Sequence, residues 1–279
     1  MPEGDTIAQS AATLDGVLRG RTVTGFRSPV PGVEGRAQAL GVVGSRIAAV
    51  EARGKHLLIR FHPSPPAPLS LARERGSQGA VLRTHMRMTG SWHLYRAGSH
   101  WRKPASFARA VVEAGDVLAV CFSAPEIELL AGEQLAGHAG LRRLGPDLLA
   151  PDFDEAEALA RLRAAPDLEI ADALLNQSIV AGIGNVYKSE ILFLERVSPF
   201  ATVSSLSDET LQRLVRTARR QLLRNVGTAE RRTTTGRQRS ALWVYDRAGQ
   251  PCARCGAPIR RVAQGPHARS TSWCPTCQQ

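Results

Sequence analysis

The apolar residues near the beginning of the chain recur with the period of an α-helix. Over residues 6–19 they form one stripe, made of Ile7, Ala8, Ala11, Leu14, Val17 and Leu18. Asp5 precedes the stripe as a helix cap, and Gly20 follows it as a residue typical of a helix end. The pattern therefore predicts an N-terminal helix, with Pro2 and Glu3 just before its first turn.

After this helix and up to about residue 130, the pattern changes to short runs with β-strand character, separated by turns. These runs cover residues 21–26, 46–52, 56–61, 81–95 and 117–122. Residues 62–80 are rich in proline, serine and glycine, which predicts a flexible surface loop. Short strands that follow a single helix favour a β-sandwich or barrel for this part of the chain.

Residues 140–225 return to a helical pattern. Helices are expected over residues 156–165, 170–178, 189–195 and 208–223. A turn-rich break at residues 180–185 (Val-Ala-Gly-Ile-Gly-Asn) separates the second of these helices from the third. The C-terminal stretch that follows is basic and rich in turn residues, and it holds all cysteines except Cys121. The chain thus divides into three stretches of different character.

The charge balance narrows the class of partner. The 279 residues carry 36 Lys and Arg against 25 Asp and Glu, which gives a net charge of +11 and a pI of about 10.4. Such an excess favours a polyanion, either nucleic acid or an anionic membrane surface. No window approaches the roughly 20 apolar residues of a membrane span, and the polar start does not begin a signal peptide. We therefore expect an intracellular protein that binds nucleic acid.

The spacing of the cysteines predicts a metal site. Cys252-x2-Cys255 and Cys274-x2-Cys277 are separated by 18 residues, the pattern of a tetrahedral four-cysteine zinc site. Disulfides are a poor alternative in an intracellular protein, and a redox motif needs only one such pair. Because four thiolates fill the coordination sphere, the zinc is expected to be structural. Cys121 lies in an apolar strand and is expected in the core rather than as a reactive thiol.

The first residues offer a candidate nucleophile. Removal of Met1 would leave Pro2 as the terminus, with a secondary amine in place of an amide. A chain α-amine titrates near pH 8, so about a tenth of it is neutral at pH 7. An amine that attacks a sugar carbon needs a proton donor and acceptor, and Glu3 lies next to it. The alternative is a solvated, frayed chain end.

Four motifs in a fixed order identify a family. They are Met-Pro-Glu-Gly at residues 1–4, Arg-Gly-Lys-His-Leu at 53–57, Gly-Ile-Gly-Asn-Val-Tyr at 182–187, and Val-Tyr-Asp-Arg at 244–247, which leads into the cysteine pairs. With them, residues 1–61 and 81–279 resemble the formamidopyrimidine-DNA glycosylase/endonuclease VIII family of base-excision repair enzymes.

This resemblance implies an α+β fold in three domains. The first, residues 1–130, would be an N-terminal helix plus a catalytic β-sandwich. Residues 131–240 would form a helical domain with a helix–two-turn–helix motif, and residues 241–279 a four-cysteine zinc finger built as a β-hairpin.

The resemblance also implies the catalytic roles. Pro2 would attack the sugar C1′, displace the damaged base and form a Schiff base with the strand. Glu3 would protonate the ribose ring oxygen and later move protons. Lys55 would lie at a β-hairpin tip and reach the sugar and phosphate beside the lesion; the alternative for Lys55 is an exposed lysine at a turn.

Three further residues would hold the DNA. Asn185, in the helix–two-turn–helix turn, would grip a phosphate together with backbone amides; a left-handed turn asparagine is the alternative. Arg269 matches the zinc-finger arginine that clamps the phosphates flanking the flipped nucleotide. Met88 stands at the position of the family's intercalating loop and would fill the vacated stack; the alternative is a core methionine on a strand.

Departures from the family pattern point to one branch. Residues 123–130 read Ser-Ala-Pro-Glu-Ile-Glu-Leu-Leu, where the formamidopyrimidine branch carries Asp-Pro-Arg-Arg-Phe-Gly. The stretch from Thr233 to Tyr245 is short for a loop that caps an oxidised purine. Both features favour the endonuclease VIII branch and oxidised pyrimidines. Asp5 replaces the family's usual proline and Thr6 its usual glutamate, as in an actinobacterial endonuclease VIII-like subgroup, which leaves base preference and rate open.

The sequence thus predicts a bifunctional DNA glycosylase and abasic-site lyase that removes oxidised pyrimidines and cleaves the strand by β,δ-elimination. It would bind damaged or abasic double-stranded DNA and one structural Zn2+. We expect a monomer in the bacterial cytoplasm, associated with the nucleoid and not with a membrane. Two alternatives stay open: the same chemistry on oxidised purines such as 8-oxoguanine, or a zinc protein that binds damaged DNA without cleaving it. A pure binding protein has no reason to combine Pro2, Glu3 and Lys55.

Overall fold

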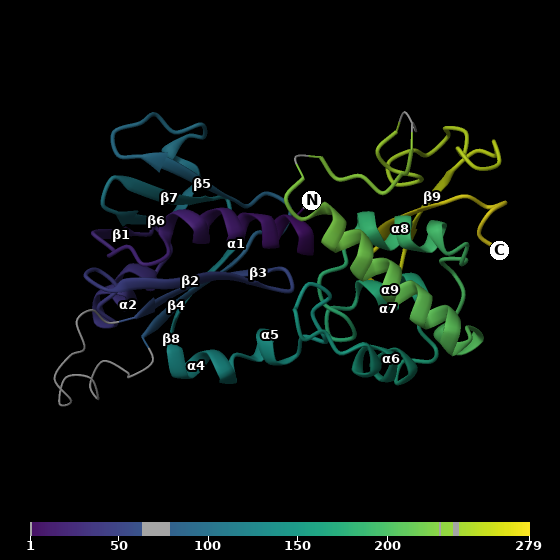
Figure 1. The fold of residues 1–279 in the computed structure, drawn as a ribbon, viewed down its shortest axis with the longest axis horizontal. Helices are drawn as coiled ribbons and strands as arrows, with labels where there is room; N and C mark the ends of the chain where they lie inside the picture. The colour runs from purple at the N-terminus through teal and green to yellow at the C-terminus, as the bar shows by residue number, and fades with distance from the viewer. Residues whose placement is uncertain (1, 63–78, 229, 237–239) are drawn as a thin grey trace. The chain divides into compact units, whose positions relative to one another are not determined.

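The computed structural model describes residues 2–62, 79–228, 230–236 and 240–279 (Figure 1). Most of the predicted surface loop at residues 62–80 therefore lies outside the described residues. The described chain forms two compact units. The N-terminal unit comprises Pro2 and Thr6–Arg142, and the C-terminal unit comprises Glu3–Asp5 and Arg143–Gln279. The three-domain division stays a prediction.

The N-terminal unit contains two four-stranded antiparallel sheets and several helices. Its helical elements are α1 (Gly4–Leu18, whose first two residues belong to the other unit), α2 (Val33–Ala39), the short 3-10 turn η1 (Ala105–Phe107), α4 (Gly132–Gly137) and α5 (Ala139–Arg142). Its strands are β1 (Gly25–Arg27), β2 (Arg46–Arg53), β3 (His56–His62), β4 (Ala80–His85), β5 (Ser91–Arg96), β6 (Ala108–Ala114), β7 (Val117–Phe122) and β8 (Glu126–Ala131).

The two sheets share one hydrophobic core with α1. One sheet has the strand order β1-β6-β7-β5 and the other β2-β3-β4-β8. Both sheets and the inner face of α1 contribute buried side chains to this core, among them Leu14, Leu57, Ile59, Val112 and Cys121. The predicted β-sandwich and N-terminal helix are confirmed, and so is the core position of Cys121. Burial raises the pKa of the Cys121 thiol, which keeps it protonated.

Two boundaries in this unit differ from the predicted ones. The run at residues 81–95 is not one strand, because β4 and β5 belong to different sheets. Between them the amide of Gly90 donates to the carbonyl of Met86 at 2.8 Å, and a Cβ at position 90 would lie 2.7 Å from that carbonyl oxygen. Only glycine permits this tight turn. Helix α1 begins at Gly4, so Asp5 lies in its first turn rather than before it.

The C-terminal unit is mainly helical up to Asn225. Its elements are α6 (Glu155–Arg163), α7 (Ile170–Leu175), α8 (Asn185–Leu194), the 3-10 turn η2 (Val203–Ser205) and α9 (Asp208–Asn225), followed by the hairpin of β9 (Arg260–Gln264) and β10 (Arg269–Trp273). Helices α6, α7, α8 and α9 share a core that includes Leu162, Leu174, Tyr187, Leu214 and Leu222. The helix expected at residues 189–195 begins four residues earlier than predicted, directly after Gly184.

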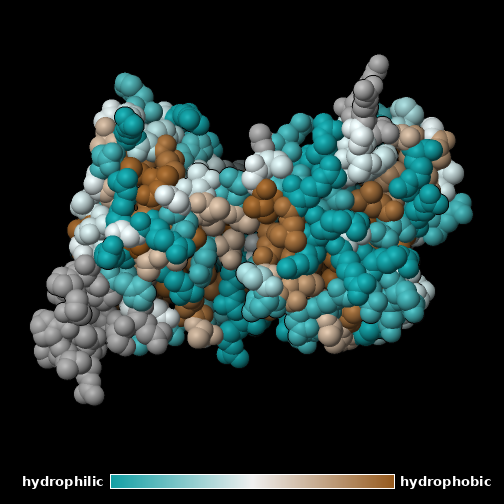
Figure 2. All heavy atoms as spheres, viewed as in Figure 1, coloured by the Kyte–Doolittle hydropathy of each residue, from teal (hydrophilic) through white to brown (hydrophobic). Residues whose placement is uncertain are grey.

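Helix α9 has a buried apolar face and an outer face with charged side chains. The hydroxyl of Ser207 caps α9 by accepting a hydrogen bond from the amide of Thr210. The buried face of this helix is mainly apolar. Its outer face carries arginines such as Arg213 and Arg216, and Figure 2 shows hydrophilic residues over this helix.

In the described part of the chain, no helix combines the length and hydropathy that a membrane span requires.

Candidate functional site

The buried carboxylate of Glu3 lies at the N-terminus of α8. Its Oε2 accepts hydrogen bonds from the amides of Gly184 (2.8 Å) and Tyr187 (3.3 Å), and its Oε1 accepts one from the amide of Val186 (2.8 Å). Glu3 has no exposed surface. The amides at a helix N-terminus form a site for an anion, and here a side chain from the start of the same unit fills it. The chain therefore holds the proposed proton donor rigidly next to Pro2.

Glycine is required on both sides of this contact. A Cβ at position 184 would lie 2.4 Å from the carboxyl carbon of Glu3. A Cβ at position 4 would lie 3.0 Å from the Cα of Gly182, whose carbonyl accepts from the amide of Gly4 at 2.9 Å. The glycines of the residue 182–187 motif thus permit the close approach of the N-terminal segment.

The Asp5 side chain is also held by residues of the C-terminal unit. Its carboxylate forms a two-point ion pair with Arg231, at 2.8 and 2.6 Å, and accepts from the hydroxyl of Tyr187 at 2.8 Å. Burial and then the Asp5 charge raise the pKa of Tyr187, so its hydroxyl stays a donor. Burial lowers the pKa of Arg231, but the hydrogen bond to Asp5 and the attraction of Glu3 outweigh burial and raise the pKa above its usual value.

Asn185 is the first residue of α8 and is 8% exposed. It does not have positive φ, so the alternative of a left-handed turn asparagine is wrong. Its Oδ1 is buried without a hydrogen-bond partner among the described residues. Three amides around it donate to Glu3, so a phosphate grip at this turn would rest on the side chain of Asn185.

Lys55 and Met88 lie in two turns of the N-terminal unit. Arg53 pairs with His56 across the β2–β3 hairpin, so Gly54 (φ +58°) and Lys55 form its tip. The predicted hairpin position of Lys55 is confirmed. Met88 lies in the turn between β4 and β5 and is 62% exposed, so the alternative of a core methionine is wrong.

A polar cluster lies under these two turns. His56 and His85 contact edge to face with ring centres 4.7 Å apart, and Nδ1 of His56 lies 3.2 Å from Nη1 of Arg83. Arg83 and Arg87 both pair with Glu126. Burial lowers the pKa of His56 to about 3 and that of His85 to about 4. Both imidazoles are therefore neutral at pH 7.

The hairpin that carries Arg269 is tied to α8. Arg269 is exposed at the start of β10, as predicted for the zinc-finger hairpin. The buried ammonium of Lys188 donates to the carbonyl of Ser270 (3.1 Å) and to the hydroxyl of Thr271 (2.7 Å). Burial lowers the pKa of Lys188 to about 8, against the attraction of Asp172 and Glu3. The residues next to Arg269 are thus fixed by a lysine on a helix.

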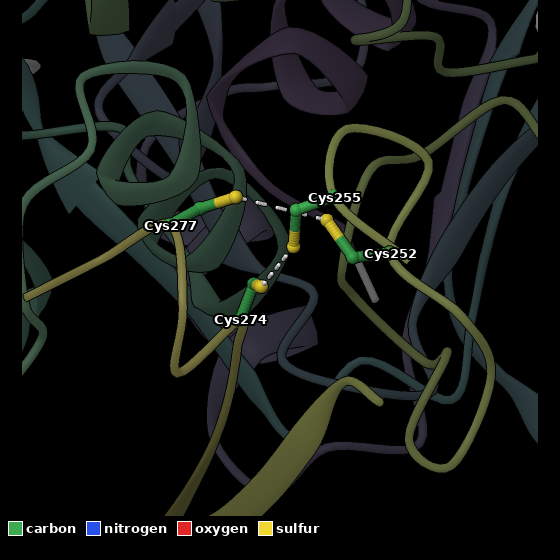
Figure 3. Close-up of side chains that lie close together, drawn as sticks. All are labelled: Cys252, Cys255, Cys274 and Cys277. Carbon is green, nitrogen blue, oxygen red and sulfur yellow. Dashed lines mark hydrogen bonds between the residues drawn. The ribbon is translucent and has the colours of Figure 1, made fainter. Parts of the chain in front are cut away.

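The predicted cysteine ligands converge (Figure 3). The sulfur atoms of Cys252, Cys255, Cys274 and Cys277 all lie within 4.8 Å of one another, and no disulfide joins them. Cys255 and Cys274 are 3.4 Å apart, and Cys252 and Cys277 are 4.0 Å apart. Sulfurs of a tetrahedral zinc site are separated by about 3.8 Å. The four thiols therefore fit one structural zinc ion. Cys252, Cys274 and Cys277 belong to a small cluster with Phe193, Val244 and Ile259.

Sequence reasoning did not identify the partners of the N-terminal segment. Arg231 and Tyr187 are separated from Asp5 by more than 180 positions, and no local pattern signals such contacts. The one available signal was the departure from the family motif at Asp5. Glu190, which is buried and accepts from the amides of Trp243, Val244 and Tyr245, was missed as well.

Three domain families match the chain. Residues 1–125 match the formamidopyrimidine-DNA glycosylase N-terminal domain, residues 144–236 the formamidopyrimidine-DNA glycosylase H2TH domain, and residues 249–279 the zinc finger found in FPG and IleRS. These matches cover the sandwich up to the start of β8, the α6–α9 region and the cysteine cluster.

Full-length relatives give the branch. The chain is 40% identical to a probable endonuclease 8 2 of Streptomyces coelicolor, over 100% of this chain and 94% of the relative. It is 36% identical to the DNA-(apurinic or apyrimidinic site) lyase Nei2 of Mycolicibacterium smegmatis, over 100% of this chain and 99% of the relative.

A solved structure supports the fold. The structure of MutM in complex with DNA containing carbocyclic 8-oxo-G superposes with a TM-score of 0.80 over 100% of both chains, at 24% identity. At that identity the likeness supports the fold alone, and the assignment rests on the family models and the full-length relatives. The chain belongs to the formamidopyrimidine-DNA glycosylase/endonuclease VIII family, and within it to the endonuclease VIII branch.

Proposed function

We propose that this chain is a bifunctional DNA glycosylase and abasic-site lyase of base-excision repair. The observation that carries the proposal is the buried carboxylate of Glu3, the residue after Pro2, which accepts hydrogen bonds from the amide of Gly184 and from two amides of α8. A protein that only binds DNA gains nothing from a fixed carboxylate beside its terminal amine. The endonuclease 8 and abasic-site lyase names of full-length relatives support the same activity.

Pro2 and Glu3 divide the chemistry. The lone pair of the Pro2 nitrogen forms a bond to C1′ as the bond from C1′ to the base breaks, and the base leaves with that electron pair. The Pro2 nitrogen then gives up its proton, and the ring oxygen takes one as the bond between C1′ and the ring oxygen breaks and the sugar opens to the iminium. Among the described residues, Oε1 of Glu3 accepts one hydrogen bond and Oε2 accepts two. We therefore assign the proton exchange to Oε1. Removal of a C2′ proton from the iminium then expels the 3′ phosphate, and a second elimination expels the 5′ phosphate.

The remaining predicted residues act on the DNA. Lys55 at its hairpin tip would contact the phosphate beside the lesion, and Arg269 on the zinc hairpin the phosphates flanking the flipped nucleotide. Met88 is exposed at a turn, which suits a wedge that fills the space of the flipped base. The Asn185 side chain would hold a further phosphate. A zinc ion held by the four cysteines would stabilise the hairpin, and with all four positions filled by thiolates its role would be structural.

Oxidised pyrimidines are the proposed substrates. Strand β7 ends at Phe122 and β8 begins at Glu126, so three residues connect them. This connection carries neither the arginine nor the phenylalanine that the formamidopyrimidine branch has in this region. We also propose that the protein acts as a monomer in the cytoplasm, at the nucleoid, in keeping with its net charge of +11.

Borohydride trapping on a duplex with one abasic site tests the activity. The purified chain, with Met1 shown by intact mass to be absent, should form a covalent adduct, and Pro2→Gly should lose it. Absence of an adduct with the wild-type chain would refute the lyase. Full trapping by Pro2→Gly would show that the proline ring is not required, since a glycine at position 2 still offers an α-amine; an adduct mapped to Lys55 by peptide mass would transfer the nucleophile to that residue.

Matched duplexes test the substrate. Base release from thymine glycol and dihydrouracil should be faster than from 8-oxoguanine under the same conditions. A preference for 8-oxoguanine would replace the pyrimidine assignment with the purine one and leave the proposed chemistry intact.

A further inference from the structure

The side chains of Asp5 and Arg231 form a two-point ion pair inside the C-terminal unit. Nε of Arg231 lies 2.8 Å from Oδ2 of Asp5, and Nη2 lies 2.6 Å from Oδ1. Only 5% of the Asp5 side chain and 16% of the Arg231 side chain are exposed. The Tyr187 hydroxyl also donates to Oδ2, and the guanidinium lies 4.9 Å from the Tyr187 ring centre. A planar fork, a third donor and a stacked ring fix the orientation of the Asp5 carboxylate.

This pair is one of three consecutive anchors on the N-terminal segment. The amides of α8 hold the Glu3 side chain, and the carbonyl of Gly182 holds the amide of Gly4 at 2.9 Å. Arg231 then holds the Asp5 side chain. The Cα of Pro2 is one peptide unit, about 3.8 Å, from the Cα of Glu3. Anchors at three successive residues therefore limit where the Pro2 nitrogen can lie.

Arg231 is itself attached to a well-fixed segment. The amide of Arg232 donates a hydrogen bond to Oδ1 of Asn225 at 2.7 Å, and Nδ2 of Asn225 donates one to the carbonyl of Arg232 at 3.1 Å. The hydroxyl of Thr233 donates to the buried carboxylate of Glu190. The backbone around Arg231 is thus tied to the C-terminal end of α9 and to α8. A guanidinium on such a segment can determine the position of its partner.

The two buried carboxylates of the N-terminal segment require the positive charge of Arg231. Asp5 adds a second buried carboxylate two residues from Glu3, and an unpaired buried carboxylate is strongly disfavoured. Arg231 neutralises Asp5 and also attracts Glu3. A proline at position 5, the usual residue of the family motif, offers no acceptor to Arg231.

Building on the proposed function, we propose that Asp5 and Arg231 are positioning residues for the reaction, whose ion pair aims the Pro2 nitrogen beside the Glu3 carboxylate. Both residues act through the main chain of the N-terminal segment and not on the sugar. Their loss should slow the attack on C1′ while leaving the affinity for DNA nearly unchanged.

The test separates the rate of attack from binding. Single-turnover borohydride trapping on an abasic duplex gives the rate, and the Kd for a duplex with a tetrahydrofuran abasic analogue gives the affinity. Arg231→Gln and Asp5→Asn should each trap about 10- to 100-fold more slowly, since misplacement of about 1 Å costs rates of this order. The Kd should change by less than about threefold. The double variant should be no slower than the slower single one, because the two residues form one unit.

Two further variants complete the design. Arg216→Gln removes an exposed arginine whose partner is Glu155 and should trap at the wild-type rate. Arg231→Lys keeps the charge without the fork and should fall between Arg231→Gln and wild type. If Arg231→Gln does not fold, the trapping rate of Asp5→Asn tests the positioning role, because asparagine preserves the size of the aspartate side chain.

The outcomes are distinct. Folded Arg231→Gln and Asp5→Asn variants that trap at the wild-type rate overturn this proposal alone, and so does a Kd that weakens in parallel with the rate. A wild-type chain that forms no adduct overturns the proposed function, and this proposal with it.

Discussion

The amide of Gly184 donates to the Glu3 carboxylate at 2.8 Å, and a side chain at position 184 would occupy the space of that carboxylate. Gly184→Ala would place a Cβ 2.4 Å from the carboxyl carbon of Glu3. The carboxylate would have to leave the α8 amides, so we expect about 100-fold slower borohydride trapping on an abasic duplex. The measurement is the single-turnover trapping rate.

Gly16→Ala is the matched control for this substitution. Gly16 lies in α1, and a Cβ at this position would meet no heavy atom within 4 Å beyond its own helix, so alanine fits there. Alanine in a helix is favoured over glycine by about 0.5–1 kcal/mol. The control should therefore trap at the wild-type rate and melt at the same or a higher temperature. Equal rates for both glycine variants would show that the Glu3 position does not limit the attack.

The pair His56 and His85 makes the N-terminal unit sensitive to acid. Burial lowers the pKa of His56 to about 3 in the folded chain, against 6.5 for an ordinary histidine. Between these values the unfolded chain binds a proton that the folded chain does not, so the free energy of unfolding falls as the pH drops from 6.5 towards 3. The contribution of His56 is about 1.4 kcal/mol per pH unit.

His56→Gln should flatten this dependence while keeping an acceptor for Arg83. Hydrogen exchange of the β3 and β4 amides between pH 6.5 and 4.5 measures it, after correction for intrinsic exchange. The variant should lose about 2–3 kcal/mol less protection than wild type over that interval. His100→Gln changes an exposed histidine and should behave as wild type. Identical pH dependence in His56→Gln and wild type would contradict a neutral buried His56.

Local patterns predicted the elements and turns that depend on neighbouring residues. The α1 stripe, the hairpin tip at Lys55 and the four cysteine ligands follow from spacing or from the family motif, and the structure has them. The division of residues 81–95 into two strands was missed because apolar residues such as Met86 and Met88 continue the β pattern through the turn. The chain passes from one sheet to the other at that point, through the tight turn that Gly90 permits.

Local patterns did not predict contacts between residues that are distant in the sequence. Glu3 was expected just before the first turn of the N-terminal helix, whereas its carboxylate accepts hydrogen bonds from amides at the start of α8, more than 180 positions away. The Asp5–Arg231 pair was hidden for the same reason. Both contacts depend on how the N-terminal segment packs in the C-terminal unit, and no periodicity encodes that packing.

Loss of zinc should unfold the C-terminal hairpin. The hydrophobic cluster around the cysteines is small, so its folding depends on metal binding, which contributes about 10 kcal/mol or more at structural sites. Elemental analysis should give one zinc per wild-type chain and much less for Cys274→Ser. The amides of β9 and β10 should lose their exchange protection in that variant, and binding to abasic duplex should weaken because Arg269 is no longer held.

Cys121→Ser controls for the loss of a cysteine as such. It changes a buried residue of the sandwich core and should retain one zinc per chain. Protected β9 and β10 amides in metal-free Cys274→Ser would show that the hairpin folds without zinc.

The buried Lys188 should give the C-terminal unit a stability that rises in alkali. Burial lowers the pKa of Lys188 to about 8, whereas an ordinary lysine titrates near 10.5. Asp172 and Glu3 favour the charged form and Arg269 disfavours it. Between pH 8 and 10.5 the unfolded chain binds a proton that the folded chain does not, so the free energy of unfolding rises with pH across this window. The rise attributable to Lys188 is about 1.4 kcal/mol per pH unit.

Lys188→Met removes this titration and fills the same space with an apolar chain. Wild type should therefore gain stability relative to Lys188→Met as the pH rises from 8 to 9.5, by about 2 kcal/mol, in urea unfolding of the zinc-loaded protein. Comparison of the two chains cancels groups that titrate equally in both. Lys103→Met, in the other unit, should follow wild type. A constant difference between wild type and Lys188→Met over this range would mean that Lys188 stays protonated in the fold, and that its bonds to Ser270 and Thr271 keep the charge despite burial.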